Sequence, residues 1–111
     1  MKNLLVLAAF SFAAACVCAP ALAAGDAASV EEKAKTCAAC HGAQGNAPAG
    51  PDFPRLAGQH QDYLLKALKD YKSGARKNPI MGAQVGGLSA QDMADLAAYF
   101  SSQKGSLHVI R

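Results

Sequence analysis

The sequence predicts a small all-α protein. Segments 59–73 and 89–103 carry apolar residues at helical spacing, and segment 27–40 opens among acidic and capping side chains that suit a helix start. No segment shows the alternation of apolar and polar residues that is typical of a strand. Proline and glycine interrupt the chain between these segments, so we expect about three main helices joined by long loops.

The first 23 residues are expected to be a secretory signal peptide. Lys2 precedes an uncharged apolar run, and small residues ending at Ala23 follow it. This order is typical of a peptide that is cleaved on export, and Pro20 suits cleavage better than a membrane anchor. Residues 24–111 are then expected to form a single periplasmic domain.

Cleavage changes the set of cysteines. Cys16 and Cys18 would leave with the signal, so the mature domain would keep Cys37 and Cys40. A domain this short usually needs a metal, disulfides or a cofactor to complete its core. The formal net charge of +3 is too balanced to indicate nucleic-acid binding.

The two loops contain most of the prolines and glycines. Residues 42–58 include four glycines and three prolines, and a loop of that length in a small domain is usually functional. The helix over 59–73 is expected to end at Gly74. Residues 75–87 are predicted to be a second loop, and Ser89 is predicted to cap the last helix.

The motif TCAACHG, residues 36–42, allows three chemistries. A thiol–disulfide oxidoreductase would need a sheet-based scaffold, for which the chain shows no pattern. A closed zinc site would need a second pair of ligands downstream, and His60 and His108 are isolated. The spacing C-x-x-C-H is that of covalent haem attachment, with thioether bonds from Cys37 and Cys40 and His41 beneath the iron.

A haem would require a sixth ligand from a separate segment. Met93 belongs to the apolar stripe of the last helix and is expected to fill the core. Met81 stands in the second loop, where no periodicity explains it, beside Pro79 and Gly82. We therefore expect Met81 to be the second axial ligand, whereas His60 and His108 are expected to face solvent.

Four stretches of the chain resemble those of a known protein family. The stretches CAACHG, GPDFPRLAGQHQDYL, NPIM and LSAQDMADLAAYFSSQKG are similar, in order and spacing, to bacterial class I cytochromes c of the c-four and c-five types. The resemblance covers the mature chain. This chain differs from c-four proteins in having one attachment motif where they have two, and in having Val30 where they often carry glycine.

The resemblance implies a cytochrome c fold around one covalently bound haem c. It implies thioethers at Cys37 and Cys40, with His41 and Met81 as axial ligands. In the family a proline carbonyl accepts the outer ring proton of the histidine, and Pro51 fits that role best, with Pro48 second.

The expected function is electron transfer between transient respiratory partners, without enzymatic activity. Two alternatives stay open: an electron-accepting subunit of a larger oxidoreductase, and a haem enzyme or gas sensor in which Met81 is labile. Arg55, Arg76 and Lys77 are candidates to neutralise the haem propionates.

Overall fold

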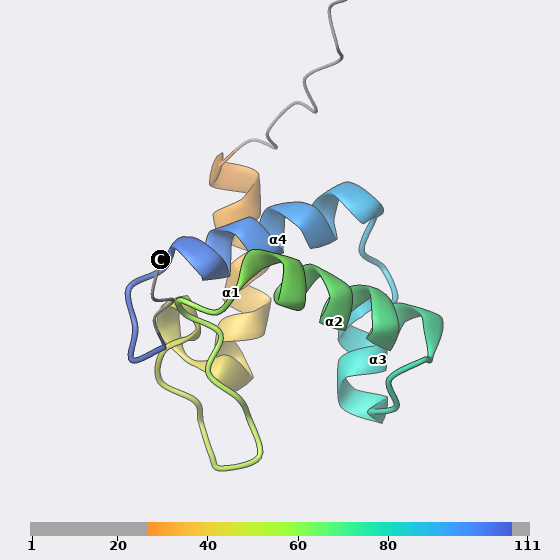
Figure 1. Cartoon of the computed structure of the whole chain (residues 1–111), viewed down its shortest axis with the longest axis horizontal. Coiled ribbons are helices and arrows are strands. Elements are labelled where there is room, and N and C mark those ends of the chain that lie inside the picture. Colours follow the sequence, from red (N-terminus) through yellow and green to blue (C-terminus); the bar gives the residue numbers. More distant parts are fainter. Residues whose placement is uncertain (1–26, 108–111) are drawn as a thin grey trace, which may run out of the picture.

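The computed structural model of the protein describes residues 27–107 and contains helices but no strand within them. Figure 1 shows α1 (Ala27–His41), η1 (Ala43–Gly45, a single 3₁₀ turn), α2 (Gln61–Ser73), α3 (Pro79–Val85) and α4 (Ala90–Ser102). The all-α prediction is therefore confirmed. The signal peptide predicted for residues 1–23 lies outside the described residues, none of whose helices is long and apolar enough to cross a membrane.

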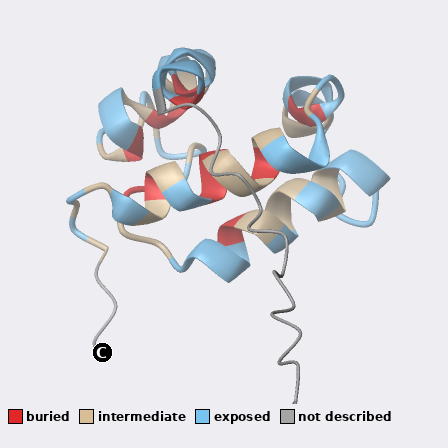
Figure 2. Ribbon diagram, turned by 90° about the horizontal axis from the view of Figure 1, so that it is seen from above, coloured by how far each residue is buried: buried red, intermediate tan, exposed pale blue. Residues whose placement is uncertain are grey.

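The core forms where α1 and α2 pack against α4. Its buried side chains are Ala34 from α1, Leu64 from α2, and Leu96, Ala97 and Phe100 from α4. Figure 2 shows that the buried residues lie on the helix faces that turn toward one another. This agrees with the helical periodicity of the sequence, which places apolar side chains on one face of each helix.

α1 and α4 contact each other through an ion pair and through the apolar side chains of the core. The Lys33 Nζ lies 2.7 Å from an Asp92 carboxylate oxygen. Val30 of α1, for which the resemblance led us to expect a departure from a frequent glycine, is buried with 7% exposure. The structure therefore accommodates the larger side chain within the packed region of α1.

The capping box predicted at the start of α4 is present. The Asp92 amide donates to the Ser89 hydroxyl oxygen at 3.0 Å, and the Ser89 amide donates to the Asp92 carboxylate at 2.9 Å. Both bonds satisfy amide groups that a helix start leaves without an intrahelical partner.

The prediction that residues 75–87 form a loop was wrong over residues 79–85, because α3 occupies Pro79–Val85. The Asn78 side chain caps this helix, and Pro79 takes its first position, where a missing amide proton and a fixed φ favour helix initiation. Proline therefore acts here as a start signal rather than as a helix breaker, and Met81 lies on a helix.

Candidate functional site

The C-x-x-C-H motif forms the last turn of α1. Cys37 and Cys40 are both half-buried and are not joined in a disulfide. Residues three apart on a helix lie on the same side of it, so the two thiols share one face. Burial raises the pKa of the Cys37 thiol above its usual value.

His41 ends α1 and is 6% exposed. Its Nδ1 lies 2.8 Å from the Pro54 carbonyl oxygen. Because a carbonyl oxygen can only accept, Nδ1 donates the proton of this hydrogen bond, and Nε2 is the ring nitrogen that remains for a metal. The Phe53 ring meets the imidazole edge-on, with centroids 6.4 Å apart.

The prediction that Pro51 supplies this carbonyl was wrong. Pro51 is exposed within a turn that the Phe53 amide closes by donating to the Gly50 carbonyl at 3.2 Å. That turn reverses the chain, and the carbonyl that reaches the imidazole belongs to Pro54. The expected kind of partner is present, three residues further along the chain.

Backbone hydrogen bonds hold the Pro54 segment against the motif. The Ala49 amide donates to the Cys40 carbonyl at 2.9 Å. The Gly45 carbonyl accepts from the Leu56 and Ala57 amides at 2.8 and 3.1 Å. The loop after α1 is thus closed on both sides of Pro54, which fixes the orientation of the histidine ring.

Met81 is half-buried on the first turn of α3, and its amide donates to Asn78 Oδ1 at 3.0 Å. In Figure 1 the loop over 46–58 and α3 both lie below α2, under its opposite ends. The competing candidates lie elsewhere: Met93 is 5% exposed within the core, and His60 is exposed at the start of α2. His108 lies outside the described residues.

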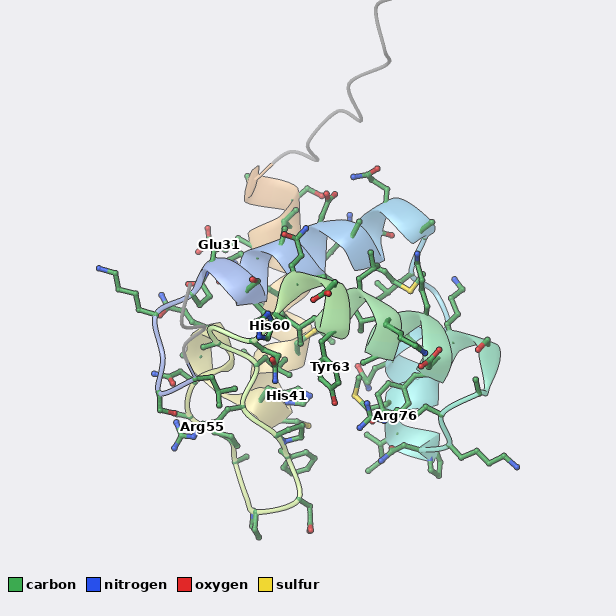
Figure 3. All side chains as sticks on the ribbon, in the orientation of Figure 1. Glu31, His41, Arg55, His60, Tyr63 and Arg76 are labelled. Atoms are coloured by element: carbon green, nitrogen blue, oxygen red, sulfur yellow. The ribbon has the colours of Figure 1, made fainter. Side chains whose placement is uncertain are left out.

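Three further side chains line this region, and the sequence did not single them out as a group. The Arg76 guanidinium lies 4.9 Å from the Tyr71 ring centroid and donates to the Tyr63 hydroxyl at 3.5 Å. In Figure 3, Tyr63 extends from α2 between His41 and Arg76. Tyr63 and Tyr71 share the helical spacing of α2, but Arg76 lies beyond the end of that helix, so only the fold reveals that the guanidinium meets them.

Arg55, a candidate for neutralising the propionates, has a different partner. Its guanidinium donates to the Asn46 backbone carbonyl, and a second contact to Asn46 Oδ1 measures 3.4 Å. Figure 3 shows Arg55 on the outer side of its loop, away from His41. Of the cationic candidates, Arg76 contacts two tyrosine side chains of α2.

The residues present fit a covalently attached haem. Attachment needs two unbonded thiols on one helix face, which Cys37 and Cys40 supply. Axial ligation needs a buried imidazole whose Nε2 is free, and His41 meets this requirement. A thioether sulfur on a separate element completes the usual donor set, and Met81 offers one.

Comparison with known proteins relates the chain to a family of haem proteins. The Cytochrome c family matches residues 27–104. Cytochrome c4 of Pseudomonas aeruginosa is 56% identical over 85 residues, which are 77% of this chain and 42% of that protein. Cytochrome c-554(548) of Halomonas halodenitrificans is 48% identical over 84 residues, which cover 73% of this chain and 100% of that protein.

A solved structure is similar as well. Reduced recombinant cytochrome c4 from Pseudomonas stutzeri superimposes with a TM-score of 0.66 at 49% identity, covering 75% of this chain and 48% of that one. The chain thus spans about half the length of the cytochromes c4 that it matches. With its C-x-x-C-H spacing at Cys37, Cys40 and His41, the chain belongs to the cytochrome c family and carries one covalently bound haem c.

Proposed function

We propose that the protein is an electron carrier that passes single electrons between redox proteins and catalyses no reaction of its own. In this proposal Cys37 and Cys40 form the thioether bonds, and His41 and Met81 fill the two axial positions of the iron. The haem supplies an iron that alternates between the ferrous and ferric states. The protein supplies burial, orientation and the choice of axial ligands.

The observation that carries the proposal is the hydrogen bond from His41 to the Pro54 carbonyl. This bond holds the proton on Nδ1, directs Nε2 away from the loop, and raises the basicity of the ring as a ligand. A histidine held in this way keeps the same orientation in both oxidation states. Little rearrangement is then needed when an electron enters or leaves.

A Met81 sulfur on the other side would leave no open position for a substrate. Thioether ligation also favours the ferrous state and raises the reduction potential. The helical cap from Asn78 supports this role, because it fixes the backbone at Met81 itself. A labile Met81 would instead suit a haem enzyme or a gas sensor.

Transient redox proteins are the proposed partners. Among the described residues, Tyr63 and Ile80 are large hydrophobic side chains with 51% and 56% exposure. Ile80 is next to Met81 in the sequence, and the Tyr63 hydroxyl accepts from Arg76, which lies just before α3. Both exposed side chains therefore lie close to the segment that carries Met81. Small, partly apolar contacts of this kind suit short-lived electron-transfer encounters.

We propose the periplasm as the location, because residues 1–23 have the features of a cleaved export signal. The mature N-terminus is then expected at residue 24. Mass spectrometry of the protein purified from its native host would test both points. An intact mass that includes residues 1–23 would contradict cleavage.

Carbon monoxide and potentiometry test the electron-carrier function together. The reduced protein should show no spectral change under carbon monoxide, and it should be oxidised and reduced reversibly in a one-electron titration. Rapid carbon monoxide binding at neutral pH would instead indicate an accessible sixth position, as expected for a sensor or an enzyme.

A further inference from the structure

The segment that carries Met81 is held to α2 by side chains at both of its ends. α3 spans seven residues, and Val85 is the one residue of α3 that is buried. So short a helix is not stable by itself. Its position must therefore come from its contacts with the rest of the fold, and its main packing partner is α2.

Arg76 attaches the chain to α2 just before α3. Its amide donates to the Asp70 carbonyl at 3.0 Å, so the backbone folds back over the end of α2. Its guanidinium then lies on the Tyr71 ring at 4.9 Å and reaches the Tyr63 hydroxyl at 3.5 Å. A planar guanidinium can make both contacts at once, which a lysine ammonium cannot reproduce.

Lys72 belongs to α2 and binds the chain just after the end of α3. Its Nζ donates to the Leu88 carbonyl oxygen. The Leu88 amide in turn donates to the Val85 carbonyl at 3.1 Å, which ties this residue to the end of α3. Leu88 also packs against the hydrophobic core. The segment between Arg76 and Leu88 is thus fixed on α2 at two points.

We propose that Arg76 and Lys72 are positioning residues for Met81, and that together they set how readily the methionine leaves the iron. The inference rests on the proposed function, in which Met81 is an axial ligand. Neither side chain touches the iron. Each acts through α3, by restricting the displacement that would carry the Met81 sulfur out of reach.

The test uses imidazole as a competing ligand for the oxidised holoprotein. Imidazole can bind the iron only where Met81 has moved away, so its apparent affinity reports the population of the displaced state. A hydrogen bond or stacking contact of ordinary strength corresponds to about fivefold in that population. Arg76→Ala and Lys72→Ala should each bind imidazole about fivefold more tightly than the wild type.

Two exposed lysines without an assigned role at the haem supply matched controls. Lys69→Ala removes a positive charge from α2, and Lys104→Ala removes one just after α4; both side chains are exposed. If loss of positive charge alone drives imidazole binding, the controls should match the test variants. We expect the controls to bind imidazole as the wild type does.

Tyr63→Phe separates positioning from loss of folding. It removes the hydroxyl that accepts from Arg76 and keeps the ring, so it decides the question even if Arg76→Ala does not fold. Tighter imidazole binding with an unchanged circular dichroism spectrum supports the proposal. Affinities in all folded variants equal to those of the controls would overturn it.

Failure of the proposed function would be distinguishable from failure of this inference. If the wild-type protein lacks a methionine-to-iron absorption band, the assignment of Met81 is wrong. If the wild type has the band but Arg76 and Lys72 do not affect imidazole binding, the ligand assignment stands and the positioning role is wrong.

Discussion

Gly45 occupies a position where an added methyl group should be unusually destabilising. It is buried in η1 with φ of +72°, and its carbonyl closes the loop that carries Pro54. A Cβ built at this position would lie 2.8 Å from the Leu56 Cβ and 2.9 Å from Phe100 Cδ1. Both neighbours belong to the packed region of the fold, so neither can move away freely.

Two effects add in Gly45→Ala. A residue with a side chain in the left-handed region costs about 1–2 kcal/mol. Overpacking of a filled region adds about 1–3 kcal/mol. The expected loss in the free energy of unfolding is therefore about 2–5 kcal/mol, the sum of the backbone term and the contacts with Leu56 and Phe100.

Gly74→Ala is the matched control. Gly74 also has a left-handed backbone, with φ of +81°, but a Cβ there would meet nothing within 4 Å. The backbone term and the reduced freedom of the unfolded chain are common to both variants. The difference between them, about 1–3 kcal/mol, therefore isolates the overpacking at Gly45.

Urea unfolding of the two holoproteins measures this difference. Helicity by circular dichroism and the haem Soret band should report the same transition. With a slope of about 1 kcal/mol per molar urea, Gly45→Ala should unfold about 1–3 M earlier than Gly74→Ala. Equal midpoints would refute the claim that the loop is packed tightly against α4 at this position.

Three further changes test the site and its supports. Replacing Cys37 and Cys40 together by alanine should give a largely unfolded, protease-sensitive chain, because haem completes a small core; a well-structured apoprotein by circular dichroism would contradict this. Met93→Ala should cost about 2–5 kcal/mol by urea unfolding while preserving axial ligation, and loss of the methionine-to-iron band would disprove its assignment to the core. Hydrogen bonding to Lys33 lowers the pKa of Asp92 from 3.8 to about 2. The wild type should therefore have a larger free energy of unfolding than Asp92→Asn at neutral pH, and this difference should vanish as pH falls from about 4 to 2. A difference independent of pH would contradict that linkage.

Local signals predicted the parts of the site that depend on short stretches of sequence. The C-x-x-C-H motif lies within one helical turn, so its spacing alone places Cys37, Cys40 and His41 together. The cap at Ser89 depends on a residue three positions away and was predicted correctly. Helical periodicity likewise predicted Met93 to be a core residue.

Features that depend on the path of a loop could not be predicted in the same way. Every residue has a carbonyl group, so nothing in the side chains distinguishes Pro54 from Pro51 as the acceptor for His41. The choice follows from the turn that closes between Gly50 and Phe53. A helix as short as α3 shows no usable periodicity, and its proline indicated a loop as readily as a helix start.

Side-chain contacts between residues far apart in the chain could not be predicted from the sequence either. Arg76 meets Tyr63 thirteen positions away, and Lys72 meets the Leu88 carbonyl sixteen positions away. Such pairs follow no helical or strand period. They arise because α3 folds back on α2, and α3 was itself absent from the sequence prediction.

The near-infrared edge of the absorption spectrum tests the central claim most directly. Oxidised wild-type protein should show the weak methionine-to-iron band, Met81→Ala should lose it, and Met93→Ala should keep it. Absence of the band from the wild type, together with an unaltered spectrum in Met81→Ala, would contradict axial ligation by Met81 and the electron-carrier function that rests on it.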